Sequence, residues 1–173
     1  MKRTLIGLLL LIFSASCRGL DSDALAKQVR LQISPAVRKG AVLHWRIVND
    51  GRLAVYVYNV FLWGPALTVQ RTPSEAVIDT TPVREDPGCP PNRFPPVLLL
   101  AIGPGRSLEG DLIDSRITGL KGLDTSMRIV VGSDPYSVVD AAKRYMSSNC
   151  KHSPYDAIVE WGTIIKSNPI RVP

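Results

Sequence analysis

The sequence has few of the features that mark catalytic or membrane-spanning proteins. Its 173 residues include three cysteines and two histidines, and its one notable apolar run, Leu5–Phe13, is nine residues long. A spanning helix needs about 20 apolar residues, so a multi-span membrane protein is excluded. With 45% hydrophobic and 21% charged residues, a wholly disordered chain is excluded too. The length suits one domain.

Sequence motifs of known catalytic centres are also missing. There is no G-x-S-x-G, no G-x-x-x-x-G-K-[ST] and no G-x-G-x-x-G. Glu109, Asp111 and Asp114 could supply a lysozyme-type carboxylate pair, but Glu109 and Asp111 share one strand face and we interpret them as solvated edge charges. We interpret His44 as an outward-facing strand residue. The sequence therefore predicts no catalytic residue, no cofactor and no enzyme activity.

Positive charge is in excess but scattered. The chain has 21 Lys and Arg against 15 Asp and Glu, without a block of five like charges. A nucleic-acid partner is not expected from this pattern.

The N-terminus has the pattern of an export signal, which we call the export address. Lys2 and Arg3 precede the apolar run, and small residues follow it up to Cys17. This order is typical of a secretory signal peptide over residues 1–16. Small residues before a cysteine resemble a bacterial lipobox, although Ser14 stands where Leu is usual. The resemblance implies lipid on Cys17, a tether over residues 17–26, and the inner face of the outer membrane, because Arg18 is not the retaining Asp. A soluble secreted or periplasmic protein and an uncleaved anchor are the alternatives.

Two further cysteines, Cys89 and Cys150, would be left in an oxidising compartment. An even pair there predicts one disulfide. It would close a loop of roughly 60 residues and stabilise the fold by about 4 kcal/mol at most. Free thiols are one alternative. A metal site with His152 is another, but no metal-ligand spacing is present, so we expect no metal.

Period-2 patterning runs through most of the remaining chain and predicts strands. Trp45 and Trp161 lie in two of these segments and are expected in the core, stacked across two sheets. The expected strands are 29–33, 43–47, 53–63, 67–70, 76–79, 97–102, 108–113, 127–131 and 159–165. Ser167 to Pro169 breaks the last strand, and residues 170–172 close the chain.

The strongest local signal is Asn49-Asp50-Gly51 between the second and third of these segments. Such a turn sequence between apolar strands predicts a β-hairpin. The third segment is apolar on both faces, so we expect it to be central.

Two segments depart from the strand pattern. Ser137 to Asp140 forms a capping box, and helical spacing follows, which predicts a short helix near 138–147. Residues 82–96 hold six prolines and predict an ordered loop pinned by Cys89. Because ordered loops on rigid scaffolds often carry function, this loop is the candidate partner contact. Its candidate residues are Pro87, Pro90, Pro91, Asn92, Arg93 and Phe94.

Many short strands with turns between them predict an all-β, antiparallel β-sandwich of about seven to nine strands over residues 27–173. The order of its motifs resembles small bacterial secreted domains with an immunoglobulin-like sandwich, and this resemblance implies the immunoglobulin-like fold. The residues that carry it are His44–Gly51, Leu53–Trp63, Pro104–Ser107 and Trp161–Asn168.

Three hypotheses for function follow from these expectations. The first is a non-catalytic cell-envelope lipoprotein that binds an unknown protein partner, with the membrane reached through Cys17. The second is a protease inhibitor that presents the loop 82–96, since a stiff loop is preorganised for insertion. The third is an envelope enzyme, which would need clustered titratable groups in a cleft.

Overall fold

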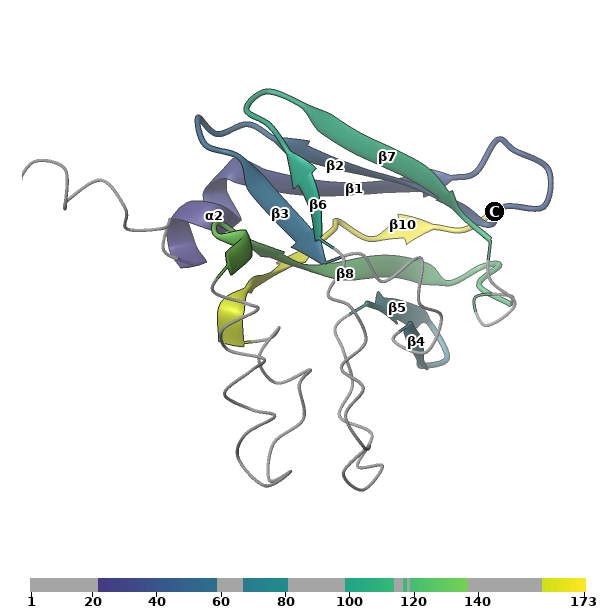
Figure 1. Cartoon of the computed structure of the whole chain (residues 1–173). Helices are drawn as coiled ribbons and strands as arrows, with labels where there is room; N and C mark the ends of the chain where they lie inside the picture. The colour runs from purple at the N-terminus through teal and green to yellow at the C-terminus, as the bar shows by residue number, and fades with distance from the viewer. Residues whose placement is uncertain (1–21, 59–66, 81–98, 114–116, 118, 137–159) are drawn as a thin grey trace, which may run out of the picture.

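A computed structural model describes residues 22–58, 67–80, 99–113, 117, 119–136 and 160–173 (Figure 1). Most of the described residues form strands, and the strands form two sheets. The elements are α2 (Ser22–Gln28), β1 (Val29–Pro35), β2 (Leu43–Asn49), β3 (Val55–Tyr58), β4 (Thr68–Arg71), β5 (Glu75–Asp79), β6 (Leu99–Ile102), β7 (Ser107–Leu112), β8 (Asp124–Gly132), β9 (Thr163–Lys166) and β10 (Ile170–Arg171).

Sheet A contains three antiparallel strands in the order β1-β2-β7. Its strands alternate as the sequence predicted: Leu31 and Ile47 are buried, while Arg30 and Arg46 are exposed. Because successive side chains of a strand point to opposite faces, this alternation gives the sheet one apolar and one polar face.

Sheet B is built around β8, and its main order is β4-β5-β8-β3-β6. Arg128 on β8 pairs with Asp79 of β5 and with Lys166 of β9, so β5 and β9 flank β8 on opposite sides. β8 is the central strand, and Ser126, Met127 and Val130 are all buried. Apolar side chains of both sheets join one core cluster, which confirms the predicted all-β sandwich. The immunoglobulin-like part of that prediction stays a prediction.

Two details of the predicted sandwich were wrong. The pairing of β5 with β8 is parallel, so the sandwich is not wholly antiparallel. The described residues also hold ten strands instead of seven to nine. The predicted break at Ser167 to Pro169 is present, but Ile170–Arg171 after it forms a further strand, β10, which pairs with β8 as β9 does.

The predicted hairpin at Asn49 was also wrong. β2 pairs with β1 and β7 in sheet A, whereas β3 pairs with β6 and β8 in sheet B. The segment between them is a corner, at which the antiparallel ribbon β2–β7 bends and continues as the ribbon β3–β6. The turn residues that suggest a hairpin serve here to carry the chain from one sheet to the other.

Asn49 holds this corner together from a fully buried position. Its Nδ2 atom donates to the carbonyls of Leu53 at 2.8 Å, Ile102 at 2.9 Å and Gly103 at 3.2 Å. Its Oδ1 atom accepts from the Gly51 N–H at 3.0 Å. The side chain thus hydrogen-bonds to backbone groups of both bending strands.

The second strand of the ribbon turns the corner at Gly103 to Arg106. The Arg106 N–H donates to the Gly103 carbonyl at 3.1 Å, and Gly105 has φ of 65°. Proline at the second position and a glycine with positive φ at the third are typical of a type II turn. The Gly105 N–H also donates to the backbone carbonyl of Asn49 at 2.9 Å, which joins the two halves of the corner.

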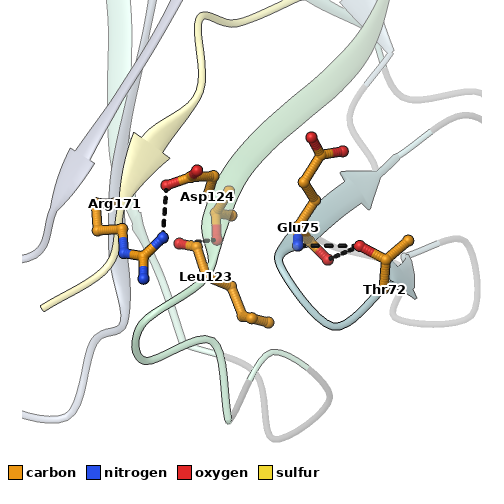
Figure 2. A network of polar contacts seen from close by, with 6 residues as sticks. Thr72, Glu75, Leu123, Asp124 and Arg171 are labelled. Atoms are coloured by element: carbon orange, nitrogen blue, oxygen red, sulfur yellow. Dashed lines mark hydrogen bonds and ion pairs between the residues drawn. The ribbon is translucent and has the colours of Figure 1, made fainter.

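At one end of sheet B the β4–β5 turn, the start of β8 and the end of the chain meet (Figure 2). Thr72 closes the turn, because its Oγ1 atom accepts from the Glu75 N–H at 3.0 Å. Arg171 of β10 lies 3.4 Å from the carboxylate of Asp124 at the start of β8. These contacts fix the C-terminal strand to the centre of sheet B.

The helix α2 was not predicted. It covers residues 22–28, within the expected tether 17–26 and across the expected domain boundary at residue 27. Its Leu25 is buried in the core, and the helix packs against β1 and β9. Residues 22–26 are therefore part of the folded domain, held on the sandwich through Leu25 and the contacts of the helix with β1 and β9.

Each of the two predicted core tryptophans lies over a glycine of a neighbouring strand. A Cβ atom on Gly110 would lie 2.7 Å from Trp45, which is buried. Trp161 lies over Gly132 in the same way and donates its Nε1–H to the Asp134 carbonyl. Trp161 is half-buried and belongs to a helical turn before β9, so the predicted strand 159–165 begins only at Thr163.

The predicted helix 138–147 lies outside the described residues. Pro135 and Tyr136 just before it are helical, and the Asp134 carboxylate accepts from the Tyr136 N–H at 2.9 Å. Asp134 therefore acts as an N-cap, three residues before the capping box that the sequence offers at Ser137.

Candidate functional site

The outward side chains of sheet A form a continuous polar surface, which we call the polar face. The strand register sets them in three rows across β1, β2 and β7. Row by row they are Arg30, Val48 and Ser107; Gln32, Arg46 and Glu109; Ser34, His44 and Asp111. The opposite side of the same strands is buried in the core, so these side chains stand on a rigid support.

His44 and Asp111 form the most sheltered pair of the polar face. Their Nδ1 and Oδ1 atoms are 2.9 Å apart, and their side chains are 36% and 22% exposed. An ionised carboxylate can only accept, so Nδ1 carries the hydrogen in this pair. The Nε2 atom is then left to bind solvent or a partner.

Arg46 makes the second pair, in the middle row. Its Nε atom lies 3.6 Å from the Glu109 carboxylate, and its Nη2 atom donates to the Ser107 hydroxyl at 3.3 Å. Both charged side chains are at least half exposed, so the pair adds only about 0–1 kcal/mol to stability. Its main effect is to set the positions of the two charges.

Arg30 and Asp50 form a bidentate ion pair at the end of the polar face nearest the corner. The guanidinium donates through Nε to Oδ2 and, at 2.9 Å, through Nη2 to Oδ1. These hydrogen bonds hold the pKa of Asp50 below its ordinary value and raise that of Arg30. A carboxyl with a lowered pKa stabilises the fold above its ordinary pKa, and this contribution is lost as the pH falls through the lowered value.

A depression of about 470 Å³ opens beside the polar face. The edge strand β1 lines it with Leu31 to Ser34, and the chain between β9 and β10 adds Asn168. His44, Arg46, Glu109 and Ile170 complete the lining. The depression therefore joins the charged rows to the side of the sandwich where β1 is the edge strand.

The row of Ser34, His44 and Asp111 has the residue types of a hydrolytic triad. A triad requires a hydrogen bond between the serine and the histidine. The structure gives His44 its bond to Asp111 but none to Ser34, and Ser34 lies on an exposed strand. The arrangement fits a solvated polar row that presents charge and hydrogen-bonding groups.

The sequence-predicted site residues lie elsewhere in the chain. All of them fall outside the described residues, so the lipid site, the disulfide and the partner-binding loop stay predictions. They are Cys17, Cys89, Cys150, Pro87, Pro90, Pro91, Asn92, Arg93 and Phe94. Within the described ranges, no three His, Cys, Asp or Glu side chains are grouped to hold a metal ion.

The sequence placed several residues of the polar face correctly without joining them. Alternation put His44 on the outward side of its strand, and put Glu109 and Asp111 together on one face. It missed the pairing of His44 with Asp111 and of Arg46 with Glu109. The register of β2 with β7 was the missing signal, because the expected hairpin assigned β2 a different neighbour.

No family model, no curated protein and no solved structure matches this chain. Among the described helices, none has the length and apolar character to cross a membrane.

Proposed function

We propose that the chain is a non-catalytic protein-binding module of the bacterial cell envelope, held at a membrane by lipid on Cys17. The export address at residues 1–16 and the cysteine that follows support the location. The inner face of the outer membrane is the proposed site, and a soluble periplasmic form is the alternative. The β-sandwich supports the role, because such scaffolds present surfaces on rigid sheets.

The observation that carries the binding role is the polar face itself. The charge pairs Arg46–Glu109 and Arg30–Asp50 and the hydrogen-bonded pair His44–Asp111 are held by one sheet and its corner. Fixed charges of alternating sign select a partner by complementarity and steer its approach, even where they add little net affinity.

The polar character of the surface indicates the chemistry of the partner. Of the nine outward side chains of sheet A, only Val48 is apolar. The partner is therefore expected to be a folded protein that contributes polar and charged groups, with the neighbouring depression receiving one of its side chains. An apolar lipid or small hydrophobic ligand does not fit such a surface.

The test is site-specific photo-crosslinking of the full chain in intact cells. A photoreactive amino acid at position 109 on the polar face should give a crosslinked product of discrete mass that contains a second protein. The same amino acid at position 121 is the control, because Lys121 is also exposed but lies on the turn before β8. Equal products from both positions, or none from position 109, would contradict the proposal.

A further inference from the structure

Among the described residues, β1 is an edge strand with little of the usual protection of an edge. All seven of its residues pair with β2 in an unbroken register, and its described partners include no strand on the other side. Natural edges are commonly blocked by bulges, inward charges, lysines or prolines. β1 has only Pro35, at its last position, and its inward residues are apolar. The depression lies along this strand, with Leu31 to Ser34 in its lining and Asn168 and Ile170 from the end of the chain beside them.

The hydrogen bonds that flank β1 reveal which of its backbone groups point away from β2. The Asp50 N–H donates to the Gln28 carbonyl at 2.8 Å, and the Ala36 N–H donates to the Val42 carbonyl at 3.4 Å. Hydrogen-bonded pairs alternate along an antiparallel ladder, so the even-numbered residues of β1 bond to β2. The N–H and C=O groups of Leu31 and Ile33 consequently point to the open edge.

We propose that this edge pairs with the β1 strand of a second copy of the chain. The two strands run antiparallel about a two-fold axis at Gln32, which places Leu31 opposite Ile33 of the other copy. Each such pair exchanges two backbone hydrogen bonds, and the symmetry makes two pairs. The two three-stranded sheets A then become one continuous sheet through the dimer.

The side chains of β1 favour pairing with itself. About the axis at Gln32, Arg30 lies opposite Ser34 of the other copy, so no like charges meet. The two Gln32 amides face each other in a non-hydrogen-bonded pair, where side chains are closest and amides can bond reciprocally. On the inward side, Leu31 and Ile33 extend the apolar face across the interface.

The other edge of sheet A, β7, has the opposite property. Antiparallel pairing of β7 with itself about Gly110 would place Glu109 opposite Asp111 of the second copy. An axis at Glu109 or at Asp111 would instead place that residue opposite the same residue of the second copy. Like charges directly opposite each other destabilise a strand pair. Charge therefore blocks self-pairing at β7 and permits it at β1, which selects a dimer over an open filament.

The first test is a disulfide trap in the full chain within the cell envelope. Cα atoms of a non-hydrogen-bonded pair are about 4.5 Å apart, which suits a disulfide. Gln32→Cys should give a band of about twice the mass of the unsubstituted chain on a non-reducing gel. Ser107→Cys, on the β7 edge, and the unsubstituted chain are the controls and should stay at background. A Gln32→Cys product with the mass of a different protein, or no product, would overturn the proposal.

The second test uses charge, since Gln32 is exposed and tolerates a change without loss of the core. Sedimentation of the detergent-extracted full chain should give a dimer for the unsubstituted protein and a monomer for Gln32→Lys or Gln32→Glu. An equimolar mixture of the two variants should regain the dimer, because opposite charges then meet at the axis. Ser107→Lys is the matched control and should remain dimeric. An unsubstituted chain that still sediments as a monomer at about 100 µM would overturn the proposal, because the Kd of any dimer would then lie above that concentration.

Discussion

The side chain of Asn49 is fully buried at the point where the chain passes from sheet A to sheet B. A buried amide must have its hydrogen-bonding groups satisfied, and the corner supplies three carbonyls and one N–H within bonding distance. The same residue therefore stabilises the corner and determines where the ribbon bends. A turn-forming residue is here part of the interior of the protein.

Replacing Asn49 tests this role. Asn49→Ala removes the donor to the buried carbonyl of Ile102 and to the part-buried carbonyl of Leu53, and should lower the free energy of unfolding by about 2–4 kcal/mol. Asn49→Asp keeps the acceptor for Gly51 but loses the donor, so it should destabilise at least as much. Chemical denaturation of the full chain measures both. An Asn49→Ala protein with an unchanged midpoint would show that the corner does not depend on these bonds.

At the level of elements, the sequence predicted the strands better than their neighbours. Alternation in β1, β2 and β7 is a local property, because it records only which side of each strand is buried. Strand order depends on contacts between distant residues, and those leave no periodic signal. The error at Asn49 had this origin: the turn chemistry was recognised, but a hairpin and a corner use the same residue types.

For the candidate site, too, the sequence predicted which side of a strand a residue faces but not which residue it contacts. The outward position of His44 followed from alternation, whereas its pairing with Asp111 needed the β2–β7 register. The helix α2 was not predicted because it has one buried apolar residue and therefore no amphipathic period. Packing against β1 and β9 stabilises it where its own sequence gives little indication of a helix.

The contribution of α2 can be measured through Leu25. Truncation to Ala removes most of a side chain that is 3% exposed, and should cost about 2–4 kcal/mol of unfolding free energy. Lys27→Ala, on the exposed side of the same helix, is the control and should change stability by less than about 0.5 kcal/mol. Equal effects of the two substitutions in thermal or chemical unfolding would mean that α2 is not part of the core.

At the scale of the whole molecule, the two sides of sheet A have different roles. The core between the sheets holds sheet A, and the charge pairs stand on its outer side. In the proposed setting the chain is tethered near α2, at the start of the folded domain. The polar face is then presented from a fixed point at the membrane.

The proposed anchor has its own test. Cells that express the full chain should incorporate labelled palmitate into it, and the label should disappear in Cys17→Ala. Cys89→Ala is the control and should retain the label, because its cysteine does not follow the export address. An unlabelled unsubstituted chain would contradict the lipid anchor, and a labelled Cys17→Ala protein would place the lipid on another residue.

The central claim, that the charge pattern of the polar face binds a partner, is tested most directly by exchanging one pair. The double variant Arg46→Glu with Glu109→Arg keeps an ion pair in the middle row but reverses its direction. Its unfolding midpoint should match that of the unsubstituted chain, because an exposed pair contributes about 0–1 kcal/mol in either orientation. For this comparison the photoreactive amino acid stands at position 107, an exposed position of the polar face that neither substitution replaces. Recovery of the crosslinked partner from the envelope should fall at least about tenfold, since misplaced charge costs about 1.4 kcal/mol or more. Undiminished recovery with the exchanged pair would contradict the account.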